Sequence, residues 1–461
     1  MMSLAAAVEM AVAEHTDTFM EESRHALAAD AAGQEQHVVP LEPVLQGLLL
    51  VLVGIIVAHL ADQLRGGKLQ NRLQCTCGGG LRYKVTRDRE WGSVVGALRF
   101  PRAYFYCETC GATRYPLDVV WELRESGDTA KSRVYLTPRA SARLAMLGAV
   151  MSYGKAAKLF AQSVGVRISS MLVWRTVQRV GKKLRAQDAA AGVKRAALAT
   201  PGKGRQVLRW LVSADGIMVG FWRDSRRRRR AEGAPEIRRR KGIAWKEAKV
   251  GVVALLDKEG DVVRGSQWYV AGMALAPAFR QTLWLVAQAR GVLRKDVVAV
   301  VTDGAKWLRA LVTRYFTWAV GIRDFFHASE HLGAMAEALY GEGSRRARRW
   351  HGRMARRLKR GEIDVLIGEW ERWKGTPKDP KRWAKELAYF STQREAMRYQ
   401  EFQDGKLPIG SGCMEAGCKT VVAERGKISG ARWTVEGFEN LLAIRVCYLN
   451  GISPEALPLS C

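Results

Sequence analysis

The segment from Pro408 to Trp433 has the sequence PIGSGCMEAGCKTVVAERGKISGARW. Its start, Gly410-Ser-Gly412, predicts a turn, and the residues after it predict a closing helix that begins near Glu415. Basic residues follow Glu415 along the segment: Lys419, Arg425, Lys427 and Arg432. Glu415 is therefore a carboxylate at a predicted helix start, in a strongly basic neighbourhood.

Two earlier motifs supply further carboxylates. Asp215, in Ser-Ala-Asp-Gly, follows the apolar run of residues 207–212, and Asp303, in Val-Thr-Asp-Gly, follows that of residues 297–301. Apolar, β-branched runs of this length predict buried strands, which deliver the next side chains to a sheet edge. Taken singly, an Asp-Gly pair is more typical of a turn. Taken singly, Glu415 is more typical of an acidic residue at a helix start, where the helix dipole stabilises its charge. Together with Glu415, the aspartates predict three converging carboxylates and hence a metal site.

The pattern around these aspartates predicts a mixed sheet. We expect a helix at residues 279–291 and strands at residues 207–212, 216–222, 249–256, 262–269, 297–301 and 320–326. Three antiparallel strands, a helix, a fourth strand, a helix and a fifth strand is the order of the ribonuclease-H-like fold. In that fold, carboxylates on the first strand and at the end of the fourth lie side by side. The expected fold class is thus α/β, an α+β multidomain chain with a ribonuclease-H-like mixed-sheet core.

The chemistry follows from the three carboxylates. Hard Mg²⁺ or Mn²⁺ prefers oxygen ligands, and two such ions about 3.5–4 Å apart can activate a water or a DNA 3′-hydroxyl and stabilise the leaving oxygen. We expect Asp215 to bridge both ions, with Asp303 and Glu415 each holding one. Glu424, nine positions after Glu415, is an alternative third carboxylate. Glu415 is preferred because the glycine-rich approach places it at a helix start.

Other residues are weaker candidates for this site. Asp324 and His327 follow the fifth predicted strand, where they are candidates to lie beside the carboxylates. His327 would position water or phosphate, although a satisfied structural histidine is favoured. The scattered cysteines have no partner spacing and are expected to pack rather than to bind metal: Cys413, Cys418, Cys447 and Cys461.

Composition shifts predict six regions. They are an N-terminal helical region (1–66), a zinc-ribbon-like β module (67–125), a helical, helix-turn-helix-like domain (126–200), the first part of the catalytic core (201–332), a helical insertion (333–405) and the C-terminal part of the core carrying Glu415 (406–461). The insertion contains four tryptophans for which a place in its core is favoured over stacking on DNA: Trp350, Trp370, Trp373 and Trp383.

The β module contains two close cysteine pairs, Cys75-Thr-Cys77 and Cys107-Glu-Thr-Cys110. Four thiolates suit tetrahedral Zn²⁺, and a module too small for its own core gains folding free energy from such a site. The two-residue spacer of the second pair is the usual one. The one-residue spacer of the first is less common, so a metal-free hairpin stays an alternative to a zinc ribbon.

The number of cysteines and the N-terminal sequence indicate the cellular compartment of the protein. Eight cysteines in 461 residues are too few for a disulfide scaffold, and no signal-peptide pattern is present, so we expect a cytoplasmic, nucleoid-associated bacterial protein. The apolar segment Val44 to Ala61 approaches the roughly 20 residues of a membrane span. Because it contains Gln46 and His59, a buried core or dimer-forming helix is favoured over a membrane anchor.

The formal net charge of +29 favours a polyanionic partner, with nucleic acid as the leading candidate. Residues 152–180 predict a helix-turn-helix; an amphipathic hairpin with a solvated basic face fits the pattern equally well. The run from Arg226 to Arg230 predicts a flexible arm on phosphate. The expected DNA contacts are Arg175, Gln178, Arg179, Arg226, Arg227, Arg228, Arg229, Arg230, Lys419, Arg425, Lys427 and Arg432.

Taken together and in this order, the motifs resemble those of ISKra-type bacterial insertion-sequence transposases, members of the DDE group with a ribonuclease-H-like core. The likeness runs from the cysteine pairs through YFYCETCG (104–111) and PLD (116–118) to GSGCMEAGCK (410–419) and SGARW (429–433). It implies that Asp215, Asp303 and Glu415 are the catalytic triad. It also implies that the four cysteines form a zinc motif and that DNA strands are cut or joined at element ends. The arginine run at residues 226–230 departs from the family pattern.

Two other functions remain alternatives. A non-catalytic DNA-binding protein derived from a transposase would keep the zinc module and the basic segments, but the intact carboxylates favour an enzyme. A stand-alone metal-dependent DNA nuclease would use the same metal site. Transposition joins two ends in one assembly, so we expect a homodimer or larger on double-stranded DNA, with residues 44–61 as its first candidate interface.

Overall fold

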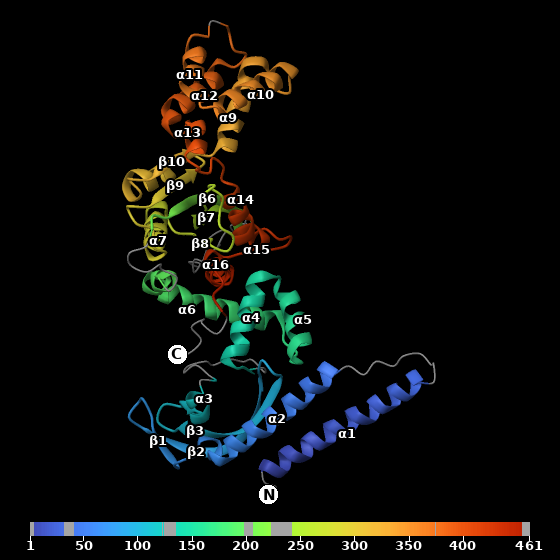
Figure 1. The fold of residues 1–461 in the computed structure, drawn as a ribbon. Helices are drawn as coiled ribbons and strands as arrows, with labels where there is room; N and C mark the ends of the chain where they lie inside the picture. The colour runs from blue at the N-terminus through green and yellow to red at the C-terminus, as the bar shows by residue number, and fades with distance from the viewer. Residues whose placement is uncertain are drawn as a thin grey trace, which may run out of the picture. The chain divides into compact units, whose positions relative to one another are not determined.

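The computed structural model describes residues 4–31, 41–121, 123, 135–197, 206–222, 242–373 and 375–453. The chain divides into two compact units, one of Met1–Val180 with Pro454–Cys461 and one of Gly181–Ser453. The predicted arginine arm, residues 226–230, lies outside the described residues. The structure is mixed α/β with two sheets, one in each unit (Figure 1).

The second unit is built on a five-stranded sheet in the order β10-β9-β6-β7-β8. Its strands are β6 (Arg209–Trp222), β7 (Ile243–Leu256), β8 (Trp268–Gly272), β9 (Val297–Thr302) and β10 (Val320–Arg323). The strands β6, β7 and β8 pair antiparallel, whereas β9 runs parallel to β6 and β10 parallel to β9. The predicted succession of three antiparallel strands and two later strands is therefore present in the structure.

The ends of the first strand differ from the prediction. Residues 216–222 do not return antiparallel, because β6 continues through Gly216 and pairs with β7 from Arg209 opposite Leu256 to Trp222 opposite Ile243. Asp215 therefore lies inside a long strand and not at its end. A glycine can stay in a ladder when a partner strand supplies its hydrogen bonds. The expected strand 262–269 is also displaced: Val262 forms only an isolated bridge, and β8 begins later.

Helices cover both faces of this sheet, as its continuous apolar strands require. On one face, Trp210 and Val300 share a core with Phe279 and Leu283 of α7 (Ala276–Ala289). This core also takes in α8 (Lys306–Ala310) and η2 (Leu311–Tyr315). On the other face, Leu211, Val301 and Ile322 share a core with α9 (Phe325–Tyr340). The alternation of neighbouring residues between the two cores fixes which way each strand faces.

The predicted insertion is helical throughout its described residues and groups beyond the β10 side of the sheet (Figure 1). After α9 it comprises α10 (Arg345–Lys359), α11 (Ile363–Glu371), α12 (Pro380–Gln393), η3 (Arg394–Met397) and α13 (Tyr399–Asp404). Trp350, Trp370 and Trp383 lie in its core, which confirms the packing interpretation for these three. Trp373 is 43% exposed and lies outside this core.

The chain returns to the sheet through a broken helix. The segment comprises α14 (Gly412–Gly417), a π-helical turn η4 (Cys418–Ala423) and α15 (Glu424–Gly426), and α16 (Val435–Leu449) follows. Glu415 lies inside α14 and not at its first residue. Buried Arg445 of α16 donates to the carbonyl oxygens of Thr420 and Val421, which the π turn leaves available.

The first unit combines helices with a second, small sheet. Its elements before residue 125 are α1 (Leu4–Ala31), α2 (Leu41–Gln63), η1 (Arg65–Gly67), β1 (Arg72–Gln74), β2 (Gly80–Gly92), β3 (Ala97–Cys107), β4 (Thr113–Arg114) and α3 (Pro116–Val120). Strands β1 to β4 form an antiparallel meander, and β5 (Tyr135–Leu136) pairs parallel with β2. Asp118 of the PLD motif forms a buried ion pair with Arg102 of β3.

The apolar helix α2 is not a fully buried core helix, which was one of the two forms that we expected; the other, a dimer-forming helix, stays a prediction. Leu50, Val53 and Val57 pack against the core of the small sheet, but Leu45 and Leu49 are half exposed. A helix packed on one side of a sheet can bury only the stripe that faces it, however apolar the rest of its surface. By length and composition alone, residues 45–63 are one candidate for a membrane span in the described part of the chain.

Three helices complete the first unit and lead into the second. They are α4 (Pro138–Val150), α5 (Tyr153–Val164) and α6 (Ser170–Ala197). Ser152 accepts the N–H of Lys155 at the start of α5, and Gly165 ends α5 in the left-handed conformation. The predicted helix, glycine turn and helix are therefore present.

Candidate active site and metal centre

Asp215 and Asp303 come from neighbouring parallel strands. Ser213 of β6 is opposite Val301 of β9, so the same register carried two residues further sets Asp215 beside Asp303. Asp303 follows β9 in a turn where its Oδ1 accepts the N–H of Ala305 at 2.8 Å. Asp215 Oδ1 accepts the N–H of Gly216 at 2.6 Å. The register therefore sets the two aspartates at neighbouring positions, although Asp215 lies in mid-strand and Asp303 follows its strand.

The electrostatics of Asp215 reflect this pairing. Burial raises the pKa of its carboxyl group, and the negative charges of Asp303 and Glu247 raise it further. The N–H of Gly216 and the thiol of Cys418 act against this rise by donating to the carboxylate. Without a cation, the site thus holds carboxylates that repel one another, which is the arrangement that binding of a divalent cation relieves.

Cys418, one helical turn after Glu415 in the broken helix, contacts Asp215 of this pair. The Sγ atom of Cys418 lies 3.8 Å from Oδ2 of Asp215. Burial raises the pKa of the Cys418 thiol to about 12, and the charges of Asp215 and Glu415 add to the rise. Asp215 and Glu415 therefore both act on one buried thiol. Glu415 itself is exposed.

The segment before Glu415 is anchored on the end of β10. Asp324, which is buried, accepts the N–H of His327 with one carboxylate oxygen and the N–H of Ser411 with the other. The N–H of Phe325 donates to the carbonyl oxygen of Ile409 at 2.8 Å. Asp324 therefore both caps α9 and fixes the turn from which α14 starts. The sequence marked Asp324 as a neighbour of the site but gave no sign of its partner, 87 positions away.

The three carboxylates do not form a compact ligand cluster. In the described ranges, only four cysteines bring ligand atoms of three or more residues within 4.8 Å of one another. The oxygens of Asp215, Asp303 and Glu415 are therefore more widely spaced than that. All three groups offer oxygen ligands, the kind that Mg²⁺ and Mn²⁺ prefer.

Glu424, the alternative third carboxylate, has a structural partner. Its Oε2 lies 2.7 Å from Nη2 of Arg445, whose side chain is buried. The same arginine holds the carbonyl oxygens of the π turn. Glu424 thus neutralises a buried cation, and Glu415, in the described residues, has no such structural partner.

Near the site, His327 has the structural contacts that the sequence analysis favoured, whereas Glu247 was not among its candidates. The Nδ1 atom of His327 lies 3.3 Å from Oε2 of Glu330, and its ring packs edge-on against His331, so its contacts are those of a structural histidine. Glu247 of β7 was missed, although its charge acts on Asp215. Its Oε2 lies 2.8 Å from Nζ of Lys249, a nearly buried lysine. The available signal was the charged stretch Lys246, Glu247 and Lys249 at the start of a strand that is apolar from residue 250 onward.

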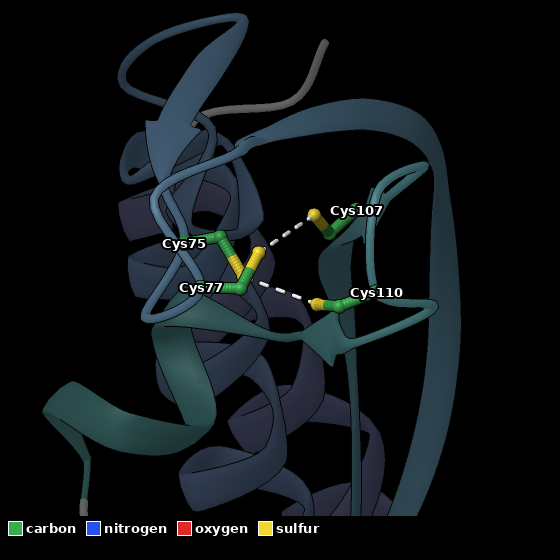
Figure 2. A group of neighbouring side chains, drawn as sticks. All are labelled: Cys75, Cys77, Cys107 and Cys110. Atoms are coloured by element: carbon green, nitrogen blue, oxygen red, sulfur yellow. Dashed lines mark hydrogen bonds between the residues drawn. The ribbon is translucent and has the colours of Figure 1, made fainter.

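The four cysteines of the β module meet at one end of the β2–β3 hairpin (Figure 2). Cys75 and Cys77 lie in the turn between β1 and β2, whereas Cys107 ends β3 and Cys110 lies in the turn before β4. The Sγ atoms are 3.6 Å apart in Cys75 and Cys110 and 3.7 Å apart in Cys77 and Cys107. Sulfurs bound to one Zn²⁺ at about 2.3 Å lie roughly 3.8 Å apart. The cluster can therefore hold a metal ion such as zinc.

Backbone amides favour the thiolate form of two of these cysteines. The N–H groups of Cys110 and Thr109 lower the pKa of Cys107 to about 6, and the N–H of Cys77 lowers the pKa of Cys75. A metal binds the thiolate and not the thiol, so amides aimed at sulfur favour the ligand form. The short spacer of the first pair does not prevent the cluster, because Gly78 and Gly79 close a tight turn with Cys75.

The residues predicted to contact DNA differ in their exposure to solvent. Arg175 and Arg179 of α6 are exposed and Gln178 is partly buried, and Arg179 donates to Ser141 of α4 at 3.2 Å. After Glu415, the exposed side chains are Lys419, Lys427 and Arg432. Arg425 is a correction, since it is 3% exposed.

Arg425 is buried because its guanidinium lies over the ring of Trp433, 5.0 Å from the centroid. A planar cation can be desolvated in this way by stacking on an aromatic face. Arg425 therefore packs the SGARW motif against the π-helical segment and does not face solvent.

No protein-family model matches the chain, and no curated protein matches it either.

Proposed function

We propose that this protein is a DDE-type DNA transposase that cuts and joins DNA strands by two-metal phosphoryl transfer. The observation that carries the proposal is the register of β6 and β9, which brings Asp215 and Asp303 to neighbouring positions, together with the contact between Asp215 and Cys418, one helical turn after Glu415. Carboxylates from distant parts of a chain are seldom brought together for stability, since their repulsion opposes folding.

The sheet supports a ribonuclease-H-like core. Its order, with three antiparallel strands followed by two parallel ones on the far side of the first, is the order expected of that fold. The helical insertion enters between β10 and α14, so the third carboxylate arrives after it. The net charge of +29, the cysteine cluster and the helix-turn-helix pattern of α5 and α6 support double-stranded DNA as the partner and a zinc ribbon as part of its recognition.

In this proposal, the carboxylates bind the metal ions and a lysine binds the DNA backbone. Asp215, Asp303 and Glu415 would hold two Mg²⁺ or Mn²⁺ ions, which when bound lower the pKa of a nucleophilic hydroxyl and stabilise negative charge on the leaving oxygen. A water or 3′-hydroxyl oxygen forms a bond to phosphorus as the bond from phosphorus to the bridging 3′ oxygen breaks. Lys427, whose charge acts on Cys418 beside Asp215, is exposed and placed to hold a backbone phosphate.

The test is strand cleavage and joining by the purified protein on DNA that carries the ends flanking its own gene, with Mg²⁺ or Mn²⁺. We expect metal-dependent products from the wild type and a loss of at least 100-fold in Asp215→Asn, Asp303→Asn and Glu415→Gln. Glu424→Gln is the matched control. Binding without any cleavage by the wild type would instead favour the non-catalytic DNA-binding protein, and cleavage without joining would favour a nuclease.

A further inference from the structure

The helix α10 carries one face made almost entirely of arginine. Residues Ala347, Trp350, Met354 and Leu358 are buried against the insertion core. On the opposite side, the helical spacing aligns the exposed side chains of Arg345, Arg349, Arg353, Arg356 and Arg360, which we call the arginine face. The face is about 22 Å long, since each helical residue advances 1.5 Å.

Acids do not neutralise this face. Among the described residues, the arginine of α10 that forms ion pairs is Arg357, with Glu362 and Glu369, and it lies beside the arginine face and not on it. Elsewhere in the same insertion, arginines are paired: Arg382 with Glu337, and Arg398 with Glu395 and Glu401. Several arginines of the insertion are thus ion-paired, whereas the described ion pairs include no member of the arginine face.

The arginine face also opposes the stability of its own helix. Its members follow one another at spacings of three and four residues, where like charges repel. The first turn of α10 contains no acidic residue and begins with Arg345 and Arg346, although helix starts favour anions. A local conflict of this kind, with no ion pair to offset it among the described residues, is typical of a surface that an external partner neutralises.

The shape of the surface fits a backbone that approaches closely. A groove of about 740 Å³ is lined by Arg349, Arg353 and Arg356 together with Gly352. A Cβ atom on Gly352 would meet only Nη1 of Arg356, at 4.0 Å, so nothing inside the chain requires glycine there. Glycine in mid-helix lowers helix stability but lets a ligand come near the helix backbone.

We propose that the arginine face of α10 binds the phosphate backbone of double-stranded DNA without reading its sequence. Guanidinium groups pair with phosphate oxygens in a bidentate manner, and a row of five matches the regular spacing of phosphates along a duplex. The inference rests on the proposed function for its choice of partner. It adds a second DNA contact surface, in the insertion, to the residues around the carboxylates.

The test compares two variants of the full-length protein that lose the same charge. One replaces Arg345, Arg349, Arg353 and Arg356 with Gln; the control replaces Lys381, Arg382, Arg394 and Arg398, in and after α12, with Gln. Both variants have a formal net charge of 29 − 4 = +25. Binding to a duplex of arbitrary sequence is measured in EDTA across a range of salt concentrations. Circular dichroism checks that both variants are folded.

We expect the α10 variant to bind DNA about 10- to 100-fold more weakly at moderate salt, with a salt dependence shallower by up to about 4 in log–log slope. The control should stay within about threefold of the wild type. A second variant, Gly352→Ala, should weaken binding while raising the melting temperature, which a damaged fold would lower. Equal affinities and slopes for the wild type and the α10 variant would overturn the proposal.

Two further arms separate DNA binding by the arginine face from membrane binding and from catalysis. If the α10 substitutions abolish binding to vesicles containing phosphatidylserine but leave duplex binding unchanged, the surface serves a membrane and the inference fails. Because binding is measured without divalent cations, loss of DNA affinity in a protein that never cleaves DNA would support the inference while the proposed function fails. If the α10 variant cleaves DNA and binds it with unchanged affinity, the proposed function is supported and the inference about the arginine face fails.

Discussion

The thiol of Cys418 lies 3.8 Å from Oδ2 of Asp215 and donates a weak hydrogen bond to it. The two residues are 203 positions apart, and the contact joins the broken closing helix to the central strand of the sheet. The thiol lowers the pKa of an aspartate that burial and the charge of Asp303 raise. Cys418 is therefore a positioning residue for the candidate metal site and not simply a packing cysteine.

Replacing Cys418 tests this role through the pH dependence of cleavage. Cys418→Ala removes the donor, so the pKa of Asp215 should rise further. Asp215 must be ionised to bind a cation, and activity is lost as pH falls through its pKa. We expect the acid limb of the pH profile to move to higher pH in Cys418→Ala and to stay nearly in place in Cys418→Ser. The rate of Mg²⁺-dependent cleavage between about pH 5 and pH 8 measures both, and an unmoved limb in the alanine variant would contradict the role.

The ionised Asp215 side chain should also lower the free energy of unfolding of the metal-free protein. Its pKa in the folded state is raised, so the stability that its protonated form contributes is lost as pH rises through that pKa. Asp215→Asn removes a charge repelled by Asp303 and Glu247. In EDTA at neutral pH we expect this variant to be more stable by on the order of 1 kcal/mol. Thermal unfolding should show the gain shrinking toward acid pH, whereas Mg²⁺ should raise the melting temperature of the wild type only.

The sequence predicted the sheet better than it predicted the limits of its strands. Runs such as residues 297–301 are apolar on both faces, so each indicated a strand covered by helices on both sides. The end of β6 could not be predicted, because Gly216 looks like a turn until the partner strand β7 is known. Local sequence does not contain the register of a distant strand.

For the candidate site too, local sequence identified candidate residues but not the contacts that they make with distant parts of the chain. The aspartates were found because each follows an apolar run, and Glu415 because of its glycine-rich approach. The burial of Arg425 could not be foreseen, since it depends on Trp433 folding back over it. The exposed face of α2 was likewise hidden, because composition cannot tell how much of an apolar helix a small sheet will cover.

Asp324 should matter for activity more than for DNA binding. Its carboxylate accepts the N–H groups of His327 and Ser411, so Asp324→Asn places an amide N–H₂ against a backbone donor. We expect a loss of about 1–3 kcal/mol in unfolding free energy and a cleavage rate at least 10-fold lower, because the turn before Glu415 loses its anchor. Asp379→Asn is the matched control, since Asp379 caps α12 in the same way but is exposed to solvent. Similar cleavage rates in both variants would show that Asp324 is only a helix cap.

The cysteine cluster should bind metal in a pH-dependent manner. The pKa of Cys107 is lowered to about 6, so the stabilisation that its thiolate provides is present at neutral pH and is lost as pH falls through that value. We expect one Zn²⁺ per chain at pH 7.5, measured by elemental analysis, and its release below about pH 6. Cys107→Ser should abolish the stoichiometric metal, whereas Cys413→Ser, outside the cluster, should leave it unchanged. A wild-type protein that retains no metal after purification in zinc would contradict the assignment.

Glu415 and Glu424 can be distinguished by separating stability from activity. Glu424 neutralises buried Arg445, so Glu424→Gln should lower the free energy of unfolding by about 1–3 kcal/mol and leave metal-dependent cleavage within a few-fold of the wild type. Glu415 is exposed, and its charge acts on Cys418, which contacts Asp215. Glu415→Gln should therefore keep the melting temperature and lose cleavage. Denaturant unfolding and a cleavage assay on both variants give opposite patterns under this assignment, and exchanged patterns would identify Glu424 as the third carboxylate.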